Sequence, residues 1–147
     1  MTPSARRAAR LTAGFGAWTV FEWATRIRNA ATDSSLSSGA KAVAVGSAAG
    51  FTAMGLVALG WVWRHRRAGL PPSTRGPLLA FAALTAAWWG GRTIFVWAHD
   101  HSTAFKVVHT VLAVISITLA MLAVRSLRAS DDDVKGQREA ATAAAGL

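Results

Sequence analysis

The feature that most constrains this chain is a run of 22 residues without an ionisable side chain, Ala42–Trp63. As a helix rising about 1.5 Å per residue, this run would extend roughly 33 Å, enough to cross a hydrocarbon core of about 30 Å. Such a helix would have no polar face to present to water, so the run is hard to reconcile with a soluble domain. The run therefore predicts a transmembrane helix.

Three further apolar segments each contain a single ionisable residue. That residue is Glu22 in the first segment, Arg92 in the third and His109 in the fourth. We therefore predict an all-α, four-helix transmembrane bundle within residues 1–128. Its helices are expected at residues 11–25, 42–63, 77–98 and 107–124.

The segment 11–25 is the shortest of the four and allows other interpretations. Its Trp and Phe side chains favour lipid over water, but a helix lying in the interface would use them as well. The preceding Arg6 and Arg7 are typical of a signal peptide. Glu22 interrupts the apolar stretch, and no small-residue cleavage site precedes Arg26, so we interpret the segment as a retained spanning helix.

The distribution of Lys and Arg predicts how the chain is threaded. With four spans, 11 cations lie on one side of the membrane and 4 on the other, with Arg92 left within it. With three spans, omitting the first segment, the counts are 7 and 8, which is almost no bias. The positive-inside rule then predicts a multi-pass cell-membrane protein with both termini in the cytoplasm. The polar residues 129–147 are expected to form a mobile cytoplasmic tail.

The net charge of +9 has two interpretations, nucleic-acid binding and membrane attachment. The cations cluster at the ends of the apolar segments, and no basic domain or Gly-aromatic RNA motif is present. We therefore expect no nucleic-acid partner. The expected partners are the lipid bilayer and the anionic lipids of its inner leaflet.

The chemistry that the sequence offers is limited. The absence of Cys excludes disulfides and thiolate sites, and no phosphate-binding loop, serine elbow or HExxH motif is present. His99, His101 and His109 could suggest a metal or haem site, but no second helix offers a His at matching depth. We therefore predict no enzymatic activity, no catalytic residue, no metal and no cofactor.

Charged residues at membrane depth are the candidate functional residues, because they are rare and usually partnered. Glu22 and Arg92 fall at similar depths near the outer surface, so they could pair between helices, with His109 nearby. Alternatively, Glu22 could pair with Arg26 one turn later, and Arg92 could extend to the headgroups. Glu22, Arg92 and His109 thus form a candidate intramembrane polar cluster.

Small residues at four-residue spacing are candidates for helix packing, because they let backbones approach closely. Gly46 and Gly50 form a GxxxG motif in the second segment, and Ala83, Ala87 and Gly91 continue the spacing in the third. These faces could pack within the bundle, or against a second copy or another membrane protein.

The sequence also suggests an internal repeat. A shift of 66 residues places Phe15, Thr19, Trp23 and Arg26 on Phe81, Thr85, Trp89 and Arg92. A shift of 65 places Lys41, Val43, Ala48 and Ala58 on Lys106, Val108, Ala113 and Ala123. The near-equal shifts are consistent with two tandem, parallel helical hairpins, although Ala-rich segments also align by chance.

Two stretches, Gly14–Ala30 and His99–Ala129, together resemble small multi-pass integral membrane proteins of actinobacteria. Residues that carry the resemblance are Trp18, Trp23, Arg26, Thr103–Phe105, Val108, His109 and Ser116. The stretches cover about a third of the chain, and the function of that group is uncharacterised. The resemblance implies a membrane protein and no particular activity. We expect a structural or accessory membrane subunit, or alternatively a small transporter or ion-linked protein that uses the polar cluster.

Overall fold

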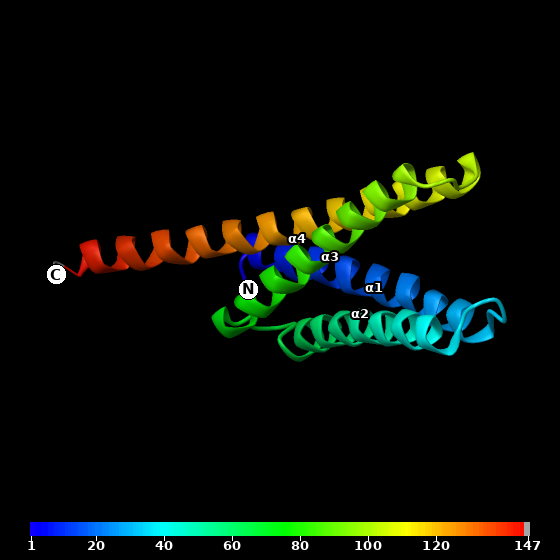
Figure 1. The fold of residues 1–147 in the computed structure, drawn as a ribbon. Coiled ribbons are helices and arrows are strands. Elements are labelled where there is room, and N and C mark those ends of the chain that lie inside the picture. Colours follow the sequence, from blue (N-terminus) through cyan, green and yellow to red (C-terminus); the bar gives the residue numbers. More distant parts are fainter. Residues whose placement is uncertain (146–147) are drawn as a thin grey trace.

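The structure is a computed structural model that describes residues 1–145, within which there are four long α-helices and no strand. The helices are α1 (Pro3–Thr32), α2 (Ser38–Arg64), α3 (Arg75–Ala98) and α4 (Thr103–Ala144), with a short 3-10 helix, η1 (Pro72–Thr74), before α3. α1 and α2 form one antiparallel hairpin, α3 and α4 form another, and α1 also packs along α4 (Figure 1). This arrangement fits the predicted all-α four-helix bundle.

The helices extend beyond the apolar segments because caps, not apolarity, determine where a helix begins. Thr2, Ser37 and Ser102 precede α1, α2 and α4, and each hydroxyl oxygen accepts a hydrogen bond from the backbone N–H three residues later. α1 consequently covers residues 3–32 rather than 11–25, and α4 begins at residue 103 rather than 107. The bounds predicted for the second and third helices are within four residues of those observed.

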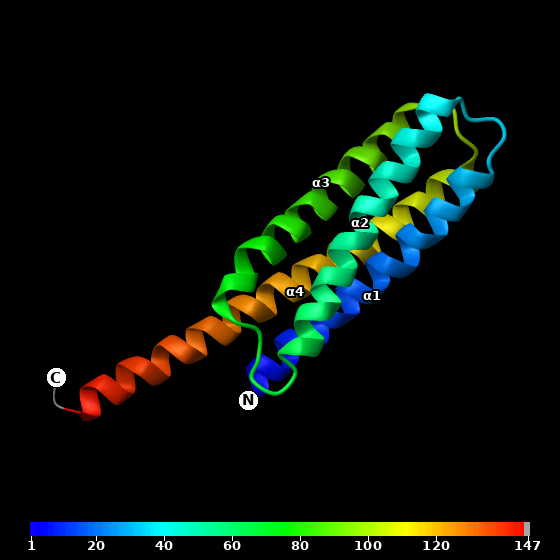
Figure 2. The ribbon, with the colours of Figure 1, turned by 90° about the horizontal axis from the view of Figure 1, so that it is seen from below.

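α4 continues as one helix through the segment that we expected to be a mobile tail (Figure 2). Elongating an existing helix needs no new nucleation, and the Ala, Glu, Lys, Gln and Arg residues of this segment are good helix formers. Most of its side chains are exposed, and Gly146 and Leu147, the end of the predicted tail, lie outside the described residues. The segment is helical as far as it is described, and its mobility stays a prediction.

One ion pair, between Arg75 and Asp131, joins the start of α3 to this extension of α4. Both side chains are partly exposed, so solvent screens the pair. We expect Asp131→Asn to lower the free energy of unfolding by less than about 1 kcal/mol. Denaturant titration beside Asp132→Asn, which removes an exposed charge without an ion pair, would measure the effect. A larger loss would mean that the extension is an integral part of the bundle.

Three helical segments are long and apolar enough to span a membrane: α2, α3 together with η1, and α4. Large apolar side chains face outward from them; Val43, Trp63 and Ile94 are 71–73% exposed. Small residues such as Ala48 and Ala58 lie between the helices instead. This distribution is typical of helices in lipid, where small residues pack and lipid covers the large side chains. The structure thus suggests a membrane protein.

α1 does not belong to this apolar set, yet it lies at the centre of the packing, in contact with both α2 and α4. Its N-terminus lies at the same end of the bundle as the α2–α3 connection (Figures 1 and 2). The α1–α2 and α3–α4 connections are both at the other end, where the two hairpins diverge (Figure 1). α1 therefore runs the length of the bundle, as a fourth spanning helix would.

Burial supports the internal repeat between α1 and α3. Phe15, Thr19 and Trp23 of α1 are buried, and so are the three residues 66 positions later. Thr19 and Thr85 each donate a 2.9 Å hydrogen bond to the carbonyl oxygen four residues earlier. Phe15 also stacks on its own counterpart, Phe81, with ring centroids 4.5 Å apart. The two helices thus meet through equivalent residues, as expected around a pseudo-two-fold axis.

The same correspondence relates α2 to α4. Four residues of α2 are buried, and each has a buried residue of α4 exactly 65 positions later. Agreement at every buried position of a helix is stronger support than matching Ala residues, because it depends on packing rather than composition. The matched pairs are Ala48 and Ala113, Phe51 and Ser116, Gly55 and Ala120, and Ala58 and Ala123.

The small residues that we expected at helix–helix contacts do not pack inside the bundle. All five are exposed, and a Cβ atom added at the three glycines would meet no atom within 4 Å. The close contact instead joins Gly16 of α1 to Gly55 of α2: a Cβ at Gly55 would lie 2.9 Å from the carbonyl oxygen of Gly16. Of the two alternatives, packing within the bundle is excluded for these residues, and packing against a second copy or another membrane protein stays a prediction: Gly46, Gly50, Ala83, Ala87 and Gly91.

Candidate functional site

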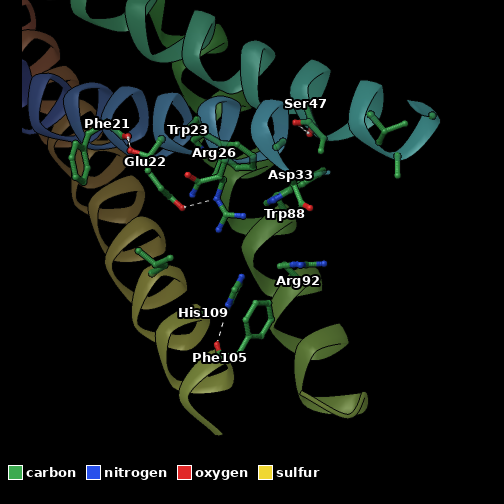
Figure 3. Close-up of a pocket in the computed structure, with 18 residues that line it drawn as sticks. Phe21, Glu22, Trp23, Arg26, Asp33, Ser47, Trp88, Arg92, Phe105 and His109 are labelled. Carbon is green, nitrogen blue, oxygen red and sulfur yellow. Dashed lines mark hydrogen bonds and ion pairs between the residues drawn. The ribbon is translucent and has the colours of Figure 1, made fainter. Parts of the chain in front are cut away.

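A cavity of about 880 Å³ lies between the two hairpins, near the end where α1 meets α2 and α3 meets α4 (Figure 3). Glu22 and Arg26 reach it from α1, Arg92 from α3 and His109 from α4. The structure thus brings all three members of the predicted polar cluster to one cavity. Aromatic and aliphatic side chains also line it: Phe21, Trp23, Val43, Trp88, Phe105 and Leu112. Further polar residues at its walls are Thr25, Asn29, Asp33 and Ser47.

Glu22 is held by a chain of polar contacts at the wall of this cavity. Its side chain is 5% exposed, and its Oε1 lies 3.5 Å from Nε of Arg26. Its Oε2 accepts a 3.1 Å hydrogen bond from the Ser116 hydroxyl, which in turn accepts a 2.9 Å hydrogen bond from the indole N–H of Trp18. The ion pair and the hydrogen bond to Oε2 stabilise a carboxylate that would be costly to bury alone, while Oε1 accepts no hydrogen bond.

Arg26 is fixed on two sides by aromatic rings. Its guanidinium carbon lies 5.1 Å from the ring centroid of Trp23 and 4.9 Å from that of Trp89, which is within cation–π range. Trp23 and Trp89 are equivalent residues of the two repeats, so Arg26 sits where the repeats meet. The guanidinium thus contacts Glu22 and two aromatic rings, while the Arg26 side chain stays 27% exposed.

Arg92 does not pair with Glu22, so the interhelical ion pair that we considered is not formed. Glu22 pairs locally with Arg26, the alternative within one helix, because four residues along a helix place two side chains side by side. Within residues 1–145, no carboxylate lies in ion-pair range of Arg92. Its guanidinium lies 5.7 Å from the Phe95 ring. The cavity therefore contains one cation balanced by Glu22 and one that is not balanced.

His109 is buried, and its Nδ1 lies 2.9 Å from the carbonyl oxygen of Phe105 in the preceding turn (Figure 3). The other two candidate ligands of the metal alternative contact aromatic rings: His99 stacks on Phe95, and the ring of His101 lies tilted against that of Phe105. Across the part of the chain that the structure describes, no three His, Asp or Glu residues are grouped to hold a metal ion.

Asp33 lies at the rim of the cavity, in the connection between α1 and α2. Hydrogen bonds from the hydroxyl and the backbone N–H of Ser35 lower the pKa of this carboxyl group. Asp33 therefore stays ionised at neutral pH. Because it is exposed, water screens its charge from the interior of the cavity.

Ser116, Trp18 and Trp88 belong to the site, although none of them was predicted to be a site residue. Ser116 had a detectable signal, since it falls on the same helical face as His109, Ala113 and Ala120. A hydroxyl on the buried face of an apolar helix indicates a polar partner on a neighbouring helix. Nothing in the sequence indicated which helix would supply that partner.

A second cavity, of about 570 Å³, lies at the opposite end of the bundle, between the start of α1 and α4. Arg6, Arg7 and Arg10 line it together with Leu122 of α4. These arginines belong to the cation-rich side that we expect to face the cytoplasm. Their position beside apolar residues is what attraction to anionic lipid headgroups requires.

No protein-family model, curated protein or solved structure matches this chain. The resemblance to small actinobacterial membrane proteins stays a prediction.

Proposed function

We propose that this chain is a multi-pass membrane protein that binds an amphipathic anion in the cavity between its two hairpins. The observation that carries the proposal is Arg92, a cation that lines the cavity without a carboxylate partner in the described structure. A buried or half-buried cation is costly when it is unpaired, so an anionic ligand would stabilise it.

The walls of the cavity support a ligand with an apolar portion. Trp88, Phe105 and Leu112 line it beside the polar groups, and a chain of methylene groups would gain free energy by contact with them. A carboxylate or phosphate headgroup would form charge-assisted hydrogen bonds with the guanidinium of Arg92. The ligand class is therefore an acyl chain with an anionic headgroup, as in a fatty acid or a phospholipid.

The proposal places this cavity on the outer side of a cell membrane, with both termini in the cytoplasm. The support is the Lys and Arg count, which favours that orientation when α1 spans. We propose a binding or transport role without catalysis, because Glu22 is engaged by Arg26 and Ser116. General acid–base chemistry needs a second positioned group that is free to exchange protons.

Arg92→Gln tests the proposal. We expect it to weaken binding of a bromine-labelled long-chain carboxylate by about tenfold or more, since a charge-assisted hydrogen bond is lost. Bromine quenches nearby indoles, so saturable quenching of Trp23 and Trp88 in zwitterionic nanodiscs reports binding. A bromine-labelled alcohol of the same length should give only weak, non-saturable quenching.

Arg28→Gln is the matched control, because Arg28 is an exposed cation of α1 that does not line the cavity. It should bind the carboxylate as the unmodified protein does. Equal binding of acid and alcohol, or equal losses in the two variants, would contradict the proposal.

A second candidate function is that of an accessory subunit that associates with another membrane helix. The observation in its favour is the outward position of Gly46 and Gly50 on α2 and of Ala83, Ala87 and Gly91 on α3. Such surfaces allow close approach of a partner helix or a second copy. Gly50→Leu should then dissociate the complex in mild detergent while leaving the unfolding temperature of the monomer unchanged.

A further inference from the structure

The cavity lies across the boundary between the two repeats, and equivalent residues line it from both sides. Every lining residue of α3 and α4 has a counterpart in the first hairpin, 65 or 66 positions earlier, that also lines the cavity. The lining of this one cavity therefore follows the internal repeat. The equivalent lining pairs are Glu22 and Trp88, Arg26 and Arg92, Ala40 and Phe105, Ala44 and His109, and Ser47 and Leu112.

The two arginines occupy equivalent positions, but their neighbours one turn earlier differ. Arg26 has Glu22 four residues before it, and Arg92 has Trp88 four residues before it. These neighbours also contact residues at equivalent positions of the two hairpins. Glu22 meets Ser116 of α4 at 3.1 Å, whereas Trp88 meets Phe51, the counterpart of Ser116 on α2, with ring centroids 5.5 Å apart. One half of the cavity is thus polar where the other is aromatic.

We propose that Glu22 makes the cavity selective for ligands whose headgroup carries a single negative charge. This inference rests on the proposed function. Glu22 forms an ion pair with Arg26, so Arg92 provides the one guanidinium in the described part of the cavity that is free to bind a ligand. The site is therefore selective for a headgroup with one negative charge, a carboxylate or a phosphodiester, over a phosphomonoester with two.

The charges that face the cavity account for this selectivity. Arg26 and Arg92 contribute two positive charges and Glu22 one negative charge, which leaves one positive charge for the ligand. A second negative charge on the headgroup would approach the Glu22 carboxylate, and repulsion is strong where water is scarce. Asp33 also faces the cavity, but it lies at the exposed rim, where water screens its charge, so its repulsion of a second negative charge is weaker than that of Glu22. The buried ring of His109 lies against the carbonyl oxygen of Phe105.

Glu22→Gln would release Arg26 and give the cavity two free guanidinium groups. We expect the affinity for a bromine-labelled phosphomonoester lipid, relative to a phosphodiester lipid, to rise by about tenfold or more. The measurement is saturable quenching in zwitterionic nanodiscs at mildly alkaline pH, where the phosphomonoester carries two charges. Ser116→Ala is the matched control, because it removes a hydrogen bond to Glu22 but keeps its charge. It should leave the affinity ratio unchanged.

Trp88→Glu provides an independent test that leaves Glu22 in place. Trp88 is 37% exposed, so the substitution is better tolerated than one at a buried position. A glutamate there lies four residues before Arg92, as Glu22 lies before Arg26, and should occupy the second guanidinium. We expect phosphodiester binding to fall by about tenfold or more relative to Trp88→Gln, which removes the same ring without adding a charge.

The outcomes separate this inference from the proposed function. If the unmodified protein binds neither lipid, the proposed function fails. If it binds the phosphodiester and loses that binding in Arg92→Gln, the proposed function stands. In that case, an unchanged ratio in Glu22→Gln, an equal shift in Ser116→Ala, or equal binding by Trp88→Glu and Trp88→Gln would each overturn the role of Glu22.

Discussion

Gly55→Leu should prevent α1 and α2 from packing as they do in the structure. Even a Cβ atom at Gly55 would lie 2.9 Å from the backbone carbonyl oxygen of Gly16 and 2.9 Å from a methyl carbon of Val20. The backbone oxygen cannot rotate away as a flexible side chain can, so the helices would have to separate. We expect a loss of about 3 kcal/mol or more in the free energy of unfolding, measured by denaturant titration with tryptophan fluorescence.

Gly60→Leu is the matched control, one and a half turns later on the same helix. A Cβ at Gly60 would meet no atom within 4 Å, and the residue is exposed. Leucine has the higher helix propensity, so the control should be neutral or stabilising by up to about 1 kcal/mol. Equal losses in the two variants would show that α1 and α2 do not meet at Gly16 and Gly55.

The glycines of α2 show why a GxxxG motif alone does not identify the residues of a helix–helix contact. Gly46 and Gly50 have the spacing of a GxxxG motif, but they lie on the outward face of α2. α2 carries small residues on more than one face, including Gly55 and Ala58 on the buried one. Where small residues surround a helix, their spacing cannot say which face meets a neighbour, and the partner helix decides.

Apolar segments predicted the number and order of the helices well, because hydrocarbon thickness requires long runs without charge. They predicted the ends of α1 poorly, since Arg6, Arg7 and Arg10 are good helix formers that lie outside any apolar run. Membership of the polar cluster was also predictable, because Glu22 and Arg92 are rare charges at similar depth.

The pairing within the cluster was not predictable from depth alone. Two arrangements of Glu22 satisfied the same charges, one with Arg26 and one with Arg92. The rings of Trp23 and Trp89 favour the first, because both lie within cation–π range of the Arg26 guanidinium that pairs with Glu22. The four-residue spacing makes the pair with Arg26 possible, and the rings of two equivalent residues from the two hairpins add contacts that the sequence alone did not reveal.

The orientation of α1 in the membrane can be tested by cysteine labelling, for which we expect an all-or-none result. The chain has no Cys, so single cysteines can be introduced and labelled with a membrane-impermeant maleimide in intact cells. Ser35 lies in the α1–α2 connection, and Ser73 lies at the other end of the bundle in η1. With both termini cytoplasmic, Ser35→Cys should label in intact cells, and Ser73→Cys should label only after permeabilisation.

Ser4→Cys distinguishes four spans from three. Ser4 is in the first turn of α1, at the end of the bundle that holds Ser73 (Figure 2). If α1 crosses the membrane, Ser4→Cys should behave as Ser73→Cys does, protected until permeabilisation. If α1 lies on the surface, Ser4→Cys and Ser35→Cys should label alike. That result would leave almost no bias in the Lys and Arg count, and the cavity between the hairpins would lose the lipid surroundings from which its ligand class is inferred.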